Sequence, residues 1–267
     1  MSFKAALTAI LAIGFAAPVA AQEARETEQG SIEPVSGFTG QMSMTMETPM
    51  PEDMAVTEVI RFEPWQMLDE MFRDDLVYVM RGGPTNWAQS DGETAAAMDC
   101  DDQRLMTKGG QDNMRQLGAL LVANGLGPGE IRVSEWCRTQ QTFVSMERGM
   151  LDADMNALDG VNVSVDPRLN LFGAEHGNDT VLGLRDAIME WDGGDEEGPL
   201  LLITHFTNIA ELLKFNVYEG EMLMVDPKRN GRVLGYLRLG SATPDSVRFD
   251  PSVVIADVDL LGTRTNN

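Results

Sequence analysis

The sequence predicts an α/β fold: a three-layer sandwich with a mostly parallel central sheet and helices on both faces. Short apolar runs alternate with segments of helical periodicity, and short links join them, which is typical of successive strand–helix units. The run 200–204, Leu-Leu-Leu-Ile-Thr, is almost continuously apolar, as expected of a central parallel strand buried on both faces. About 245 residues follow a short leader, which is enough for one sizeable core.

Each element is predicted from its local pattern. Thr107 is a helix-capping residue, apolar residues recur at helical spacing after it, and the pair Asn124-Gly125 is a typical helix end. Residues 161, 163 and 165 are valines in strand alternation. The expected elements are a helix over 65–72, a strand over 76–80, a helix from 107 to about 124, a strand over 131–133, a helix from 138 to about 150, a strand over 161–165, a helix over 181–191, a strand over 200–204, a helix over 208–215, and strands over 222–225 and 232–239 that form a hairpin.

The N-terminus is typical of a secretory signal peptide. Lys4 precedes an apolar run over 5–17, and small residues up to Ala21 form a cleavage site. We expect a signal peptide over 1–21, an acidic Met-rich lead-in over 22–60 and the α/β domain over 61–267. The protein is then periplasmic or secreted, and no later run is long enough to predict a membrane span.

The composition limits the classes of partner. The formal net charge is −22, which repels nucleic acid and anionic membranes at long range. We therefore expect no nucleic-acid partner, and the sequence identifies no protein partner. No cofactor is expected, and no metal site.

Methionines alternate with Ser and Thr at the end of the lead-in. Met42, Met44 and Met46 follow the spacing of a strand with one apolar face, and soft thioethers at that spacing can also hold Cu(I). We favour the strand, because alternation is the ordinary strand pattern.

The chain has two cysteines, Cys100 and Cys137. In an oxidising compartment one disulfide is the default. The alternatives are two separate buried thiols and a metal site, for which two cysteines without clustered histidines supply too few ligands.

Polar loops follow three of the expected strands, which is where parallel sheets place their sites. Residues 81–85 are Arg-Gly-Gly-Pro-Thr, a combination of guanidinium, hydroxyl and open backbone N–H groups that suits an anion. Residues 134–142 are Ser-Glu-Trp-Cys-Arg-Thr-Gln-Gln-Thr, and residues 204–208 are Thr-His-Phe-Thr-Asn. We predict that the first of these loops, with Arg81 and Thr85, binds phosphate or another small anion.

These loops resemble, in the same order, the motifs of the histidine phosphatase (phosphoglycerate mutase-like) superfamily. The segment over 99–107 also resembles the Cys-x-x-Gln-Arg-x-Leu-(Ser/Thr) segment of its exported members. The resemblance implies a phosphate pocket from Arg81 and Arg138, with His205 as its second histidine.

One position departs from the family motif. The first motif of the family is Arg-His-Gly or Arg-His-Ala, and its histidine becomes phosphorylated. In this sequence Gly82 stands in the place of that histidine. Glycine supplies no nucleophile, so the resemblance implies that phosphoryl transfer through a phosphohistidine is missing. The family's proton donor also has no matching residue, and Glu175 is the candidate acid.

Three functions follow from these observations. The first is a catalytically dead or weak relative that keeps an anion pocket for a phosphorylated or sulfated ligand. The second is an active phosphomonoester hydrolase with His205 or His176 as an unusual nucleophile. The third is an interaction module in which the pocket is vestigial.

Overall fold

The structure is a computed structural model that describes residues 42–47, 57–62, 72–193, 198–242 and 260–261. All of them belong to the unit Ile32–Asn267. The predicted signal peptide and all but the last residue of the predicted helix over 65–72 lie outside the described residues.

The described residues form an eight-stranded sheet in the order β1-β2-β8-β7-β3-β6-β4-β5. The strands are β1 (Met42–Glu47), β2 (Thr57–Phe62), β3 (Val77–Arg81), β4 (Glu130–Val133), β5 (Asn162–Val165), β6 (Leu200–Thr204), β7 (Met222–Asp226) and β8 (Arg232–Leu239).

The sheet is mixed. Strands β3, β6, β4 and β5 pair in parallel, whereas β7 is antiparallel to β3 and to β8. The antiparallel part contains the predicted hairpin, β7–β8, whose turn is the short 3-10 helix η5 (Pro227–Arg229). The strands β1 and β2 extend this part, because β2 pairs with β8. Met42, Met44 and Met46 thus lie on a strand, as the alternation predicts.

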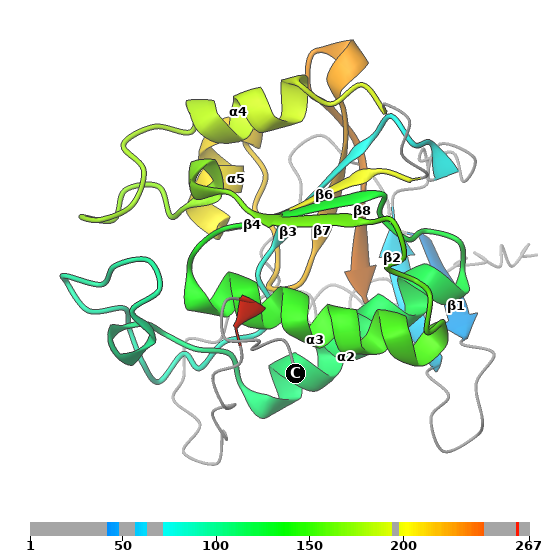
Figure 1. Cartoon of the computed structure of the whole chain (residues 1–267), viewed down its shortest axis with the longest axis horizontal. Coiled ribbons are helices and arrows are strands. Elements are labelled where there is room, and N and C mark those ends of the chain that lie inside the picture. The colour runs from blue at the N-terminus through cyan, green and yellow to red at the C-terminus, as the bar shows by residue number, and fades with distance from the viewer. Residues whose placement is uncertain (1–41, 48–56, 63–71, 194–197, 243–259, 262–267) are drawn as a thin grey trace, which may run out of the picture. The chain divides into compact units, whose positions relative to one another are not determined.

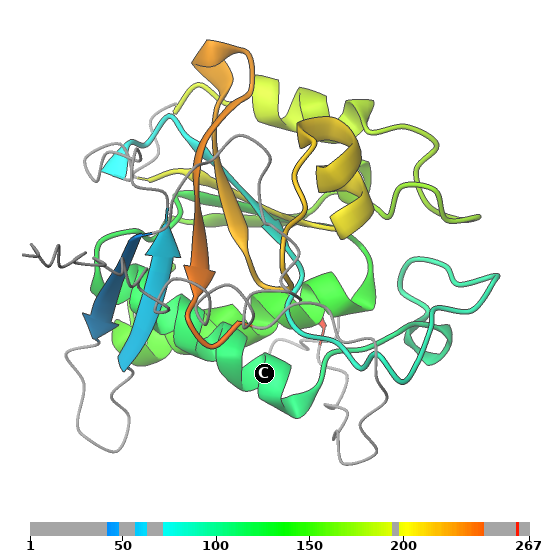
Figure 2. The same ribbon diagram turned by 180° about the vertical axis from the view of Figure 1, so that it is seen from behind.

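Helices cover both faces of the sheet, which confirms the α/β class (Figures 1 and 2). The helices α2 (Lys108–Ala123) and α3 (Cys137–Ala153) pack on one face, and α4 (Leu182–Met189) and α5 (Phe206–Leu213) on the other. The strands divide their side chains accordingly. Tyr78 and Met80 belong to the core under α2 and α3, while Val77 and Val79 belong to the core under α4 and α5.

The helix ends follow the sequence closely. Thr107 caps α2, its side-chain oxygen accepting the N–H of Gly110 at 2.8 Å. The backbone N–H of Asn124 ends the same helix by donating to the carbonyl of Leu120. Within the described residues, no helix has the length and apolar character needed to cross a membrane.

The parallel strands bring the polar loops to one edge of the sheet. Arg81 is the last residue of β3, Ser134 follows β4, and His205 follows β6 as the cap of α5. Since β3 and β4 both pair with β6 in parallel, these three positions share one edge. This edge is where the site must be sought.

Candidate functional site

A cavity of about 350 Å³ lies at the carboxyl ends of β3 and β6. Four of the residues predicted to form the site line it, together with Gly82. The lining residues are Arg81, Gly82, Thr85, Trp87, Asp91, Arg104, Arg138, Leu171, Thr204, His205, Phe206, Thr207 and Glu219.

Arg81 is held at the end of its strand by three kinds of contact. Its Nη1 donates to the carbonyl of Val217 at 2.7 Å, and its Nη2 lies 3.7 Å from a carboxylate oxygen of Glu219. Its guanidinium also lies over the ring of Phe206, 5.1 Å from the centroid. The guanidinium is therefore fixed in place and partly neutralised by Glu219.

Gly82 lies in the cavity wall without filling the space beside it. A Cβ atom at this position would meet Cγ2 of Thr139 and Oγ1 of Thr142 at 3.5 Å, which is ordinary van der Waals contact. By contrast, a Cβ at Gly83 would meet Cγ of Met114 at 2.5 Å. Packing thus favours glycine at Gly83, whereas a Cβ atom is accommodated at Gly82.

Arg138 enters the cavity from the first turn of α3. Its Nη1 donates to both carboxylate oxygens of Asp91, at 2.8 and 3.0 Å. Burial lowers the pKa of Arg138, and the charges of Asp91 and of the other guanidinium groups act on it as well. The arginine predicted to hold an anion therefore already holds one from its own chain.

Arg104 is a third cavity arginine, and it has a different environment. Its guanidinium stacks over the ring of Trp87 at 4.0 Å from the centroid, and its buried Nε has no hydrogen-bond partner. Within the described residues no carboxylate forms an ion pair with its side chain, unlike Arg81 and Arg138. Its charge is the one that stays available to a ligand.

His205 is buried and belongs to a short hydrogen-bond chain. The Ser134 hydroxyl donates to Oδ1 of Asn170 at 3.0 Å, and it lies 2.9 Å from Nε2 of His205. With its only hydrogen given to Asn170, this hydroxyl accepts from Nε2–H. Burial, and then the guanidinium groups of Arg138 and Arg81, hold the pKa of His205 well below 6.5, so the ring is neutral at neutral pH.

Glu219 is the second carboxylate of the cavity. It accepts hydrogen bonds from the backbone N–H and hydroxyl of Thr85 and from Nε1 of Trp87. The next residue, Gly220, donates its N–H to the carbonyls of Arg81 and Gly82, at 3.2 and 3.1 Å. The loop after α5 is thereby fastened to the end of β3. The Thr85 hydroxyl, predicted to bind an anion, donates its hydrogen bond to Glu219.

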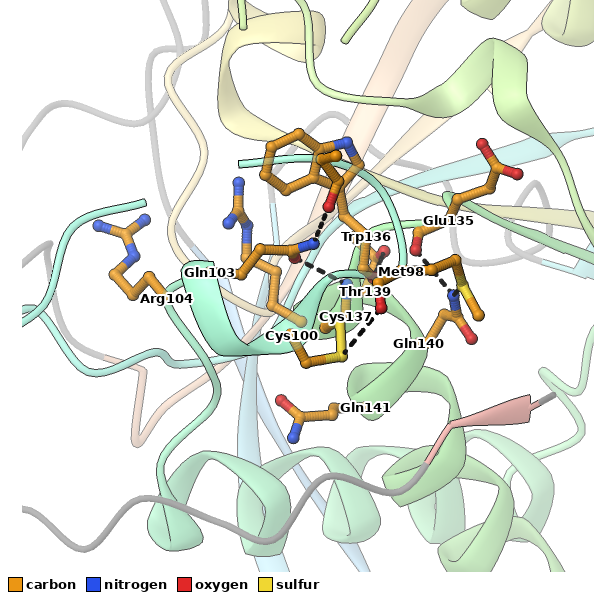
Figure 3. Close-up of a disulfide and its surroundings, with 12 residues drawn as sticks. Met98, Cys100, Gln103, Arg104, Glu135, Trp136, Cys137, Thr139, Gln140 and Gln141 are labelled. Atoms are coloured by element: carbon orange, nitrogen blue, oxygen red, sulfur yellow. Dashed lines mark hydrogen bonds between the residues drawn. A yellow bond between two sulfur atoms is a disulfide. The ribbon is translucent and has the colours of Figure 1, made fainter. Parts of the chain in front are cut away.

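The predicted disulfide is confirmed: Cys100 and Cys137 are joined, 37 residues apart in sequence. It ties the turn η3 (Cys100–Asp102) to the first residue of α3 (Figure 3). Beside it, Oε1 of Gln103 accepts the N–H of Cys137 at 2.9 Å. These two links hold the segment of Arg104 against the start of α3, which carries Arg138.

The loop of Glu175 and His176 lies outside the cavity lining. Both residues are exposed, and neither belongs to the cavity lining. The loop contacts another loop instead, through a backbone bridge between Ala96 and His176. The carboxylates that do line the cavity are Asp91 and Glu219, for which the sequence carries no motif.

No protein-family model matches the sequence, and no curated protein matches it. Several solved structures are similar in fold. The protein histidine phosphatase SixA complexed with tungstate is 17% identical, with 59% of this chain and 93% of that chain covered and a TM-score of 0.42. A putative phosphohistidine phosphatase SixA from Agrobacterium tumefaciens is 15% identical (64% and 98% covered, TM-score 0.39). A phosphoglycerate mutase from Plasmodium falciparum is 19% identical (65% and 94% covered, TM-score 0.38). This likeness is one of fold.

Proposed function

We propose that this protein is an exported anion-binding relative of the histidine phosphatases that lacks phosphatase chemistry. The observation that carries the proposal is Gly82. It stands in the cavity wall, immediately after Arg81, at the position where the motif it resembles has the phosphorylated histidine. The remaining parts of the pocket, Arg138 and His205, line the same cavity.

The electrostatic part of the site supports binding. Three guanidinium groups and a neutral imidazole face a cavity that holds two carboxylates, so one net positive charge remains. A pocket of this kind stabilises a bound anion, as the equivalent parts of an enzyme stabilise charge in a transition state. The absence of a nucleophile removes the covalent step, which usually costs many orders of magnitude in rate.

The second pocket histidine, His205, has a task other than nucleophilic attack. Its Nε2 is engaged by the Ser134 hydroxyl, which Asn170 fixes from the other side. An in-line nucleophile needs a nitrogen lone pair aimed at phosphorus. Because Nε2 carries the ring proton and donates it to Ser134, this nitrogen has no lone pair for an in-line attack, and the lone pair of the ring lies on Nδ1.

The proposed place of action is outside the cytoplasm. The N-terminal signal-peptide pattern supports export, and the Cys100–Cys137 disulfide suits an oxidising compartment. The proposed organisation is a signal peptide over 1–21, a lead-in over 22–60 and the domain over 61–267.

Hydrolysis of an aryl phosphate tests the proposal, at mildly acidic and neutral pH. The natural chain is compared with Gly82→His and with Gly82→Gln, a control of similar size without a nucleophilic ring. We expect turnover only from Gly82→His. Turnover by the natural chain, abolished by His205→Ala, would overturn the proposal. A third outcome is that neither the natural chain nor Gly82→His turns over substrate and that phosphate raises the melting temperature of neither. The pocket is then vestigial and the protein is an interaction module.

A further inference from the structure

We propose that the cavity selects singly charged oxyanions carried on an apolar body, in preference to doubly charged phosphate monoesters. This inference rests on the proposed anion-binding function and narrows its ligand class. A sulfate monoester and a carboxylate have the required head group. The inference follows from how charge is distributed over the cavity lining.

Two of the three cavity arginines already form ion pairs with carboxylates of the chain itself. Asp91 accepts two hydrogen bonds from Arg138, and Glu219 forms an ion pair with Arg81. Both guanidinium groups are buried, where opposite charges interact more strongly than in water. A ligand therefore meets one uncompensated positive charge, and a second negative charge on its head would stay unpaired.

Asp91 is held in its place by more than the ion pair. Its Oδ1 also accepts the backbone N–H of Arg104 at 2.8 Å. Moving the carboxylate aside to free Arg138 would break this bond as well as the pair. The internal anion is thus a fixed part of the site, which sets the charge that a ligand must bring.

Arg104 is the residue that remains for the ligand's head group. Its buried Nε has no hydrogen-bond partner among the described residues, and its guanidinium stacks on the ring of Trp87. A planar guanidinium offers two parallel N–H donors, which match the oxygens of a sulfate or carboxylate group. Its face is already occupied by the indole, so its edge is the binding surface.

The rest of the cavity wall suits an apolar body. Trp87, Leu171 and Phe206 line it, and the cavity volume of about 350 Å³ is at the lower end of the range for small-molecule sites. A ligand of the size of one substituted ring therefore fits, with its head toward Arg104.

Calorimetric titration with phenyl sulfate and phenyl phosphate tests the selection, because the two ligands share one body. At about pH 8 the phosphate monoester carries two charges, since its second pKa is about 6. We expect the natural chain to bind phenyl sulfate about tenfold more tightly or better at low ionic strength.

Asp91→Asn removes the internal charge and keeps an oxygen for the Arg104 N–H. It should shift the ratio of the two affinities toward phenyl phosphate by about tenfold. Glu93→Gln removes the same charge from an exposed residue of the same loop, and it should leave the ratio unchanged.

Each outcome separates the two claims. Equal binding of the two ligands by the natural chain, or a preference for phenyl phosphate, overturns the selection but leaves an anion pocket. An equal shift from Asp91→Asn and Glu93→Gln also overturns it, because the effect would then come from overall charge. Failure of the natural chain to bind either ligand overturns the proposed function as well.

Discussion

The Nε2 atom of His205 lies 2.9 Å from the hydroxyl oxygen of Ser134, which in turn donates to Asn170. This contact fixes the ring in the form that carries its proton on Nε2. The neutral ring is maintained by burial and by the surrounding guanidinium groups, which lower its pKa. The consequence for stability can be measured.

The low pKa of His205 predicts a loss of stability in mild acid. Below about pH 6.5 the unfolded chain takes up a proton on this residue and the folded chain does not, so the unfolded state is favoured as the pH falls. Relative to His205→Gln, the natural chain should lose up to about 1.4 kcal/mol of unfolding free energy per pH unit below that point. Urea unfolding at several pH values measures the difference. His176→Gln removes an exposed histidine and is the control; parallel curves for the natural chain and His205→Gln would contradict the prediction.

The two glycines after β3 should respond differently to an added methyl group. Gly82→Ala places Cβ at 3.5 Å from its nearest neighbours, and it should change the free energy of unfolding by less than about 1 kcal/mol. Gly83→Ala drives Cβ against Met114 and Met106, so it should cost about 1–3 kcal/mol. Thermal or urea unfolding of the pair measures this, and equal costs would show that the wall at Gly82 is closed.

The disulfide should contribute strongly to stability. It closes a loop between residues 37 apart, for which loop-closure entropy gives about 4 kcal/mol. The double variant Cys100→Ser with Cys137→Ser should be less stable by roughly that amount in urea unfolding. Its anion affinity should fall too, because the bond positions the segment of Arg104 against α3. An unchanged affinity in the folded variant would show that Gln103 alone positions this segment.

A buried ion pair supports the loop that carries Glu219. Arg238 donates to Glu221 through Nε and Nη2, at 3.2 and 3.1 Å, and both residues are buried. Removing the cation with Arg238→Met leaves the carboxylate unpaired and should cost about 3–5 kcal/mol at neutral pH.

Burial already raises the pKa of Glu221, and loss of Arg238 raises it further. The folded variant then binds a proton that the unfolded chain does not, so its stability deficit should shrink as the pH falls toward about 5. A deficit that is independent of pH would mean that the residue's packing, and not its charge, matters.

The elements of the fold follow from local sequence. The strand β6 has the predicted bounds, and the cap at Thr107 is where the sequence places it. The helix α3 begins one residue before the predicted start, at Cys137. Apolar runs, helix caps and glycines at helix ends depend on only a few neighbouring residues. The bounds of helices and strands can therefore be predicted without knowledge of the tertiary structure.

The site could be predicted only in part. Arg81, Arg138 and His205 stand at strand or helix ends, where the topology itself brings them together. Asp91, the partner of Arg138, lies 47 residues from it in the sequence, and Glu219, the partner of Arg81, lies far along the chain. Both carboxylates stand in loops that have no sequence pattern of their own. The antiparallel pairing of β2 with β8 could not be predicted for the same reason, because the two strands lie far apart in the sequence.

We propose above all that Gly82 leaves an anion pocket without its nucleophile. The most direct test is to mix the natural chain and Gly82→His with an aryl phosphate at mildly acidic pH, quench both rapidly, and look for a phosphoryl group by intact mass and an alkali-stable phosphohistidine signal. We expect Gly82→His to carry the phosphoryl group on the introduced histidine and the natural chain to stay unlabelled. A phosphoryl group on His205 of the natural chain, or a folded, anion-binding Gly82→His protein that stays unlabelled, would contradict it.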